Sequence, residues 1–189
     1  MIWQLALFLG LVLWWGAHLF KRLAPARRVA MTDRMGEAAR GPIAFTILIS
    51  VVLIVIGFRG SDFVPVYDPP GWGRPVNNIL MLIAVALMGL GSSKSRARRL
   101  MRHPMLTGFL IWAVAHLLVN GDRDSIIMFG ALGLWALVQM VLINRAEPDW
   151  QRFEGGSVAG DIRLAVISLV VFAVIAAVHI WLGYNPFKA

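Results

Sequence analysis

Four histidines are the residues best suited to do chemistry in this chain of 189 residues, which contains no cysteine. Neutral imidazole is a common metal ligand, and two imidazoles can hold a haem iron between them. The lack of cysteine excludes thiolate catalysis, disulfides, iron–sulfur clusters and zinc-finger sites. The candidate ligands lie within or at the edge of long apolar stretches: His18, His103, His116 and His179.

Each histidine also has an ordinary structural explanation, because an imidazole near a membrane boundary can bond to backbone, water or lipid headgroups. His103 precedes Pro104 at an expected helix start, where the positive end of the helix dipole keeps an imidazole neutral. His103 and His116 would lie about 20 Å apart along one helix and point to nearly opposite faces. These two histidines therefore cannot share one iron.

The elements that must position the histidines are membrane-spanning helices. The chain is 59% hydrophobic and 15% charged, which is too apolar for a soluble domain. Stretches without Asp, Glu, Lys or Arg cover residues 2–20, 42–58, 76–90, 105–119, 125–143 and 164–182. We therefore predict an all-α fold, a polytopic bundle of about six spans that forms one transmembrane domain over residues 1–189. The third and fourth stretches are short, so their flanking turns should reach the headgroup region.

The formal net charge of +8 arises from residues between the apolar stretches, which favours membrane topology over nucleic-acid binding. Six, five and three Lys and Arg residues stand in the first, third and fifth loops, against two, one and one in the other loops and the tail. By the positive-inside rule, both termini should be periplasmic and the basic loops should lie in the cytoplasm. His18 and His103 would then lie near the cytoplasmic face, and His116 and His179 near the outer face.

Small and polar residues within the stretches predict how the helices pack. Helices with small residues can approach closely or leave space for a flat ring; those residues here are Gly10, Gly16, Ala84, Ala86, Gly130 and Gly133. Hydrogen bonds between helices are the expected role of the few polar side chains, which are Thr46, Ser50, Gln139 and Ser168.

Several segments resemble the NnrU family of bacterial membrane proteins over essentially the whole chain. The most specific are residues 102–108 (RHPMLTG) and 112–122 (WAVAHLLVNGD), and residues 17–19 (AHL) and 36–41 (GEAARG) also fit. That family is named for a link to nitrogen-oxide reduction in denitrifying bacteria. It is similar to the plant zeta-carotene isomerases, which are membrane enzymes that bind haem b. The resemblance thus implies haem b as the cofactor.

The isomerase comparison places its two haem-associated histidines on His18 and His116, with Ala113 where a cysteine stands three residues before the second ligand. Depth in the membrane instead pairs His116 with His179, and His18 with His103. The pattern at His103 also resembles membrane methyltransferases that act on isoprenylcysteine, in which this His helps to bind S-adenosylmethionine. In that comparison Arg145 and Glu147 fall near a downstream Arg/Glu motif, while Leu106 replaces its Tyr.

The sequence therefore predicts an inner-membrane protein that binds haem b through histidine and serves nitrogen-oxide or related membrane redox metabolism, with a redox partner. One alternative is an enzyme on a lipidic substrate, either isomerase-like or methyltransferase-like. Another alternative is a non-catalytic membrane assembly partner whose histidines are only interfacial. The reaction, the substrate and the oligomeric state stay open at this point.

Overall fold

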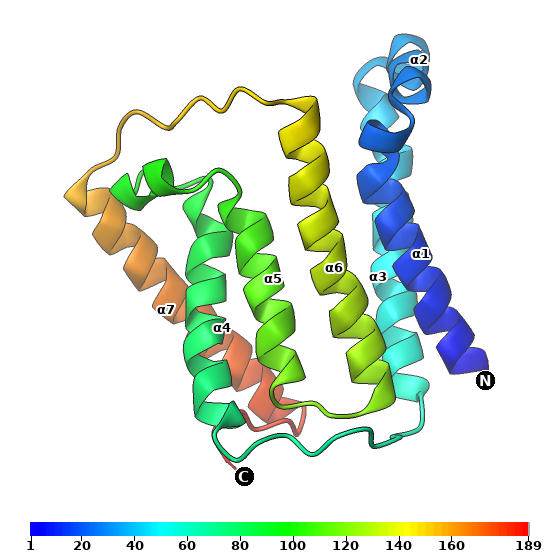
Figure 1. Ribbon diagram of the computed structural model, residues 1–189, viewed down its shortest axis with the longest axis vertical. Helices are drawn as coiled ribbons and strands as arrows, with labels where there is room; N and C mark the ends of the chain where they lie inside the picture. Colours follow the sequence, from blue (N-terminus) through cyan, green and yellow to red (C-terminus); the bar gives the residue numbers. More distant parts are fainter. Residues whose placement is uncertain (189) are drawn as a thin grey trace.

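Six apolar helices confirm the predicted helical membrane bundle in the computed structural model, which describes residues 1–188 (Figure 1). In chain order these are α1 (Ile2–Leu23), α3 (Arg40–Gly60), α4 (Gly73–Leu90), α5 (Pro104–Leu117), α6 (Arg123–Ala146) and α7 (Val158–Trp181). The described residues form no strand, and only isolated bridges join Pro65 to Asp122 and Ser95 to Ser157.

Five of the six helices are long and apolar enough to cross a membrane. The exception is α5, whose 14 residues rise about 21 Å against a hydrocarbon thickness of about 30 Å. The sequence also predicted that this fourth span would be short. The third span, α4, begins at Gly73, ahead of the predicted apolar stretch 76–90. The chain on either side of α5 must therefore lie at headgroup depth, which brings His103 and His116 close to the two membrane surfaces.

The first basic loop contains helical structure that the apolar pattern did not predict. The short helix α2 (Pro25–Met35) follows α1, and the 3-10 helix η1 (Gly36–Ala39) leads into α3. Pro25 occupies the first turn of α2, where its missing N–H costs nothing. No residue of α2 is buried, so this helix lies outside the packed core.

The helices pack in sequence-adjacent antiparallel pairs that α6 joins together. In Figure 1, α1 lies along α3, α5 lies between α4 and α6, and α7 crosses behind α4. The α1–α3 contact is close because Gly57 of α3 has no side chain: a Cβ there would overlap the backbone nitrogen of Leu7. Gly108 of α5 allows the same approach to α4, where a Cβ would lie 2.7 Å from the carbonyl oxygen of Ala84.

The alternating direction of the helices gathers the basic loops at one end of the molecule. That end, at the top of Figure 1, holds α2, the 3-10 helix η2 (Arg96–Leu100) and the segment between α6 and α7. The amino terminus and the end of α7 lie at the opposite end. This arrangement places His18 and His103 at the basic end of the molecule, and His116 and His179 at the opposite end.

Candidate functional site

A series of aromatic rings joins His18 on α1 to His116 on α5. The His18 ring centroid lies 4.8 Å from that of Trp135 on α6, and Trp135 lies 5.2 Å from Phe109 on α5. From Phe109 the centroids step 5.0 Å to Trp112 and a further 5.0 Å to His116. The two histidines predicted by family resemblance are therefore connected through packed rings, and the rings also keep them apart.

Each of the two histidines is held by neighbours that fix its ring. Trp14 packs on His18 with centroids 4.2 Å apart and planes inclined by 35°. Phe129 of α6 stacks on His116 at 4.6 Å with planes inclined by only 24°. Such contacts restrict rotation of the imidazoles. Both rings thus have a defined orientation inside the bundle.

Hydrogen bonds define which ring nitrogen of these histidines carries the proton. Nδ1 of His18 bonds to the carbonyl oxygen of Trp14 at 2.8 Å, and Nδ1 of His116 to that of Trp112 at 2.9 Å. His179 makes the same bond to Ile175 at 2.8 Å. A carbonyl oxygen only accepts, so Nδ1 is the donor in all three. The lone pair of Nε2 is then free, which is the tautomer of an imidazole that binds a metal through Nε2.

His103 differs from the other three histidines, because its Nε2 bonds to Oδ1 of Asn144 at 2.8 Å. Nearby, Glu147 forms a 2.8 Å ion pair with Arg22, and Arg102 donates to the carbonyl oxygen of Glu147. The hydrogen bond from Arg22 lowers the pKa of Glu147 below its usual value. This polar group at the basic end ties α1, α5 and α6 together, and its members already have partners within the chain.

His116 and His179 both lie at the end of the bundle opposite the basic end, each in the last turn of its helix. On α4, which packs against both α5 and α7, Asn77 is buried and its Oδ1 has no partner within residues 1–188. Of the two pairs predicted by depth, His116 and His179 share one end of the bundle, while His18 and His103 at the basic end have separate neighbours.

Two of the six small residues singled out in the sequence, Gly130 and Gly133, line a hollow on the Ala113 face of α5. It measures about 220 Å³ and lies between α5 and α6, beside Ala113, Gly130 and Gly133. At about 100° per residue, Ala113 and His116 point some 60° apart around the helix. The volume is below the roughly 300 to 1,000 Å³ of typical small-molecule sites. Any large planar ligand at His116 would therefore reach into the lipid-facing surface.

Sequence reasoning missed two buried polar atoms beside His18. Nε1 of Trp14 and Nε1 of Trp135, whose rings contact His18, are buried and have no hydrogen-bond partner within residues 1–188. Oε1 of Gln139, a side chain predicted to bond between helices, is also buried without a partner within those residues. Trp usually lies at the membrane boundary, where its N–H is hydrated. The position of Trp14 and Trp135 in the middle of apolar stretches was therefore a signal that could have identified them.

The donor set suits a haem better than a bare metal ion. Residues 1–188 contain no cluster of three His, Asp or Glu side chains that could hold an ion. A haem needs only one or two axial ligands from the protein, because the macrocycle supplies the other four. Three histidines have a free Nε2, and a single one of them would meet that requirement.

Comparison with known families and proteins gives one match. Curated proteins and solved structures show no significant similarity to the chain. The profile described as NnrU protein matches residues 6–186, which include all six long helices except the first residues of α1. Since that match covers nearly the whole chain, and the six apolar helices agree with a membrane protein, the chain belongs to the NnrU family.

Proposed function

We propose that this NnrU-family membrane protein binds haem b through histidines of its spans and serves nitrogen-oxide or related redox metabolism in the inner membrane. The observation that carries the proposal is the hydrogen bonding of three imidazoles, which leaves Nε2 of each ring free. His18, His116 and His179 each donate Nδ1–H to a backbone carbonyl four residues earlier. This outer bond orients a histidine ligand and makes its free nitrogen more basic.

His116 is the histidine best supported as the iron ligand. It is one of the two ligands that the isomerase resemblance names, and it also belongs to the pair favoured by depth. Its ring is held by Trp112 and Phe129, with Nε2 left free. Burying an imidazole in an apolar span costs free energy when a ring nitrogen has no partner. Coordination of a metal by Nε2 would offset that cost.

His179 is the better candidate for the second ligand. Metal–imidazole bonds are about 2 Å long, so two axial histidines must lie at nearly the same depth. His18 is separated from His116 by Trp135, Phe109 and Trp112, whereas His179 lies at the same end of the bundle as His116, each in the last turn of its helix. A haem with two imidazole ligands supplies one-electron redox chemistry. The protein would contribute the ligands and the apolar surroundings that set the potential.

The test is an absorbance spectrum of the purified protein, oxidised and reduced, after expression with an adequate supply of haem. The proposal predicts a Soret band and reduced-state bands typical of low-spin haem b with two nitrogen ligands. A protein that is folded and inserted but has no Soret band contradicts the proposal. A haem content near two per chain would extend it to a second site at His18, the remaining histidine with a free Nε2.

A further inference from the structure

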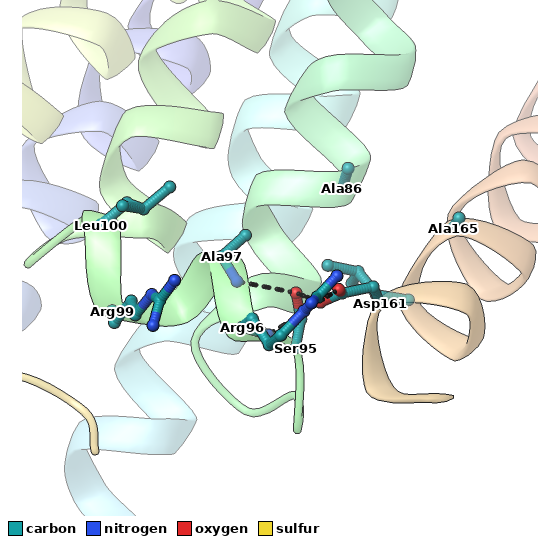
Figure 2. A pocket seen from close by; sticks show the side chains of 9 residues that line it. Ala86, Ser95, Arg96, Ala97, Arg99, Leu100, Asp161 and Ala165 are labelled. Atoms are coloured by element: carbon teal, nitrogen blue, oxygen red, sulfur yellow. Dashed lines mark hydrogen bonds and ion pairs between the residues drawn. The ribbon is translucent and has the colours of Figure 1, made fainter. Parts of the chain in front are cut away.

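A hollow of about 480 Å³ lies far from His116, where α4, η2 and the first turns of α7 meet (Figure 2). One part of its wall is apolar and consists of Ala86, Leu100, Leu164 and Ala165. The other part carries the guanidinium groups of Arg96 and Arg99. It stands at the basic end of the molecule, where the apolar spans end. The hollow therefore combines a cationic and an apolar lining at the depth of lipid headgroups.

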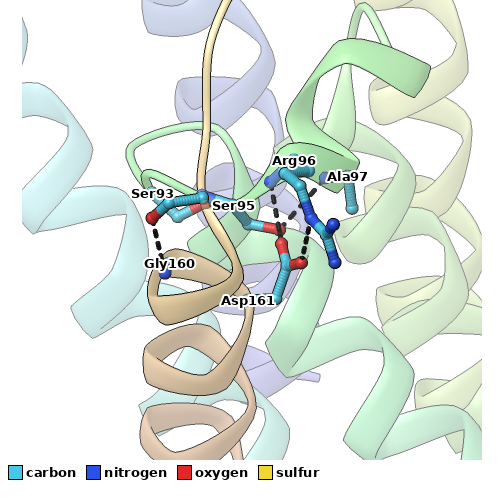
Figure 3. A network of polar contacts seen from close by, with 7 residues as sticks. Ser93, Ser95, Arg96, Ala97, Gly160 and Asp161 are labelled. Atoms are coloured by element: carbon cyan, nitrogen blue, oxygen red, sulfur yellow. Dashed lines mark hydrogen bonds and ion pairs between the residues drawn. The ribbon is translucent and has the colours of Figure 1, made fainter.

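The cationic part of the wall is fixed by Asp161 of α7 (Figure 3). Oδ1 of Asp161 accepts from Ser95 Oγ at 2.7 Å and from the backbone N–H of Arg96 at 2.8 Å. Oδ2 accepts from Nε of Arg96 at 2.6 Å. This contact uses only the Nε edge of the guanidinium. Both terminal amino groups of Arg96 keep their donors free of partners within residues 1–188.

The backbone under the hollow is also held firmly. The N–H of Ser157 donates to the carbonyl oxygen of Lys94 at 3.0 Å, and Ser157 caps α7 by accepting from Gly160. Gly160 lies so close to Lys94 that a Cβ there would overlap its carbonyl oxygen. The loop before η2 is thus clamped to the first turn of α7. The arginines are positioned by packed backbone, which reduces the entropy lost when a ligand binds.

The charges of the lining match a single phosphodiester. Arg96 and Arg99 carry one positive charge each and Asp161 carries one negative charge, so the site has a net charge of +1. Arg99 is exposed and makes no hydrogen bond or ion pair within the described chain. Guanidinium groups bind phosphate through paired hydrogen bonds. Leu100, next to Arg99, is 73% exposed, which places an apolar side chain where an acyl chain would pass.

We propose that this hollow binds one anionic glycerophospholipid. Its phosphate would contact Arg96 and Arg99, and an acyl chain would lie against Leu164, Ala165 and Ala86. A zwitterionic lipid carries an additional ammonium group and has no net charge to match the site. Inorganic phosphate has the charge but no apolar part, so it would use only half of the lining.

The test measures lipid binding to the purified full chain in detergent, by native mass spectrometry and by thermal unfolding. Phosphatidylglycerol, phosphatidylcholine and inorganic phosphate are titrated separately. We expect phosphatidylglycerol to stay bound and to raise the unfolding temperature, while the other two have little effect. One Arg near the membrane surface contributes about 1 kcal/mol, so Arg99→Gln should weaken phosphatidylglycerol binding about fivefold.

Two further variants distinguish the site from general charge effects. Arg34→Gln removes an exposed Arg of α2 that has no partner within residues 1–188, and it should bind phosphatidylglycerol like the parent. Ala165→Phe adds a ring to the apolar wall, which occupies the space of an acyl chain, and keeps both arginines. This variant should also lose phosphatidylglycerol binding. Ala165 is exposed, so this variant should fold.

Three results would overturn the proposal. The first is equal retention of phosphatidylglycerol and phosphatidylcholine. The second is equal lipid affinity of the Arg99→Gln and Arg34→Gln proteins when both unfold at the parent temperature without lipid. The third is full stabilisation by inorganic phosphate alone, which would identify a site for a soluble anion.

Discussion

The imidazole of His116 stacks on the phenyl ring of Phe129, with centroids 4.6 Å apart and planes 24° from parallel. This contact joins α5 to α6 near the outer end of the molecule. Phe129 is 5% exposed and also packs against Trp112 and Phe58. Phe129 therefore holds the ring of the candidate iron ligand against α6.

Replacing Phe129 by Ala should lower the free energy of unfolding by about 3 kcal/mol, because it leaves a cavity among packed rings. Phe8→Ala is the matched control: Phe8 is 64% exposed on the outside of α1, so its loss should have little effect. Unfolding in a mixed-micelle titration measures both. Equal stability of the two variants would show that the ring contacts at His116 contribute little.

The packing of α1 against α3 should be disrupted when a side chain is introduced at Gly57, where the two helices are closest. A Cβ at Gly57 would overlap the backbone of Leu7 and lie 2.7 Å from the carbonyl oxygen of Trp3, and backbone cannot give way locally. We expect Gly57→Leu to reduce the yield of folded protein severely, with Gly57→Ala intermediate. Gly16→Ala meets nothing within 4 Å and should behave like the parent. Thermal unfolding of purified protein checks the order, and wild-type stability of Gly57→Leu would disprove the close approach of α1 to α3.

Membrane topology follows from the basic loops and can be measured without any ligand. Reporters fused within residues 92–99 should read cytoplasmic, and a fusion after the carboxyl terminus should read periplasmic. A paired reporter that is active only in the periplasm provides the reciprocal control at both sites. Location of both fusions on one side of the membrane is incompatible with six spans.

The methyltransferase-like alternative predicts S-adenosylmethionine binding that depends on His103 and Glu147. We expect no binding by calorimetry, because His103 bonds to Asn144 and Glu147 is paired with Arg22. Leu106 also replaces the Tyr of that motif. Micromolar affinity that disappears in His103→Ala would favour this alternative over a redox role.

The number of spans could be predicted because lipid permits only apolar, internally bonded segments. Helix α2 was missed because its polar, exposed residues resemble a loop in composition. Thr46 and Ser50 were predicted to bond between helices, and this was wrong. They donate to Pro42 and Ile47 of their own helix, whose carbonyls are always within reach.

The histidines could be chosen from the sequence, but their neighbours could not. His18 meets Trp135 across more than 100 residues, and apolar patterns do not specify which spans are adjacent. The Nδ1 bonds of His18, His116 and His179 need only a helix, because the carbonyl four residues earlier is nearby in any helix. Relative depth was predictable from helix ends, and His116 and His179 both lie in the last turns of their helices at the same end of the bundle.

The most direct test of haem binding is the absorbance spectrum of His116→Ala beside His18→Ala and His179→Ala. His116→Ala should lose the haem bands while the protein remains inserted, because the span keeps its apolar length. His179→Ala should also lose the low-spin spectrum, whereas His18→Ala should keep it; the opposite order would support the pairing of His18 with His116. Full haem content with an unchanged spectrum in His116→Ala would contradict iron ligation by His116 and leave this histidine as a packing residue.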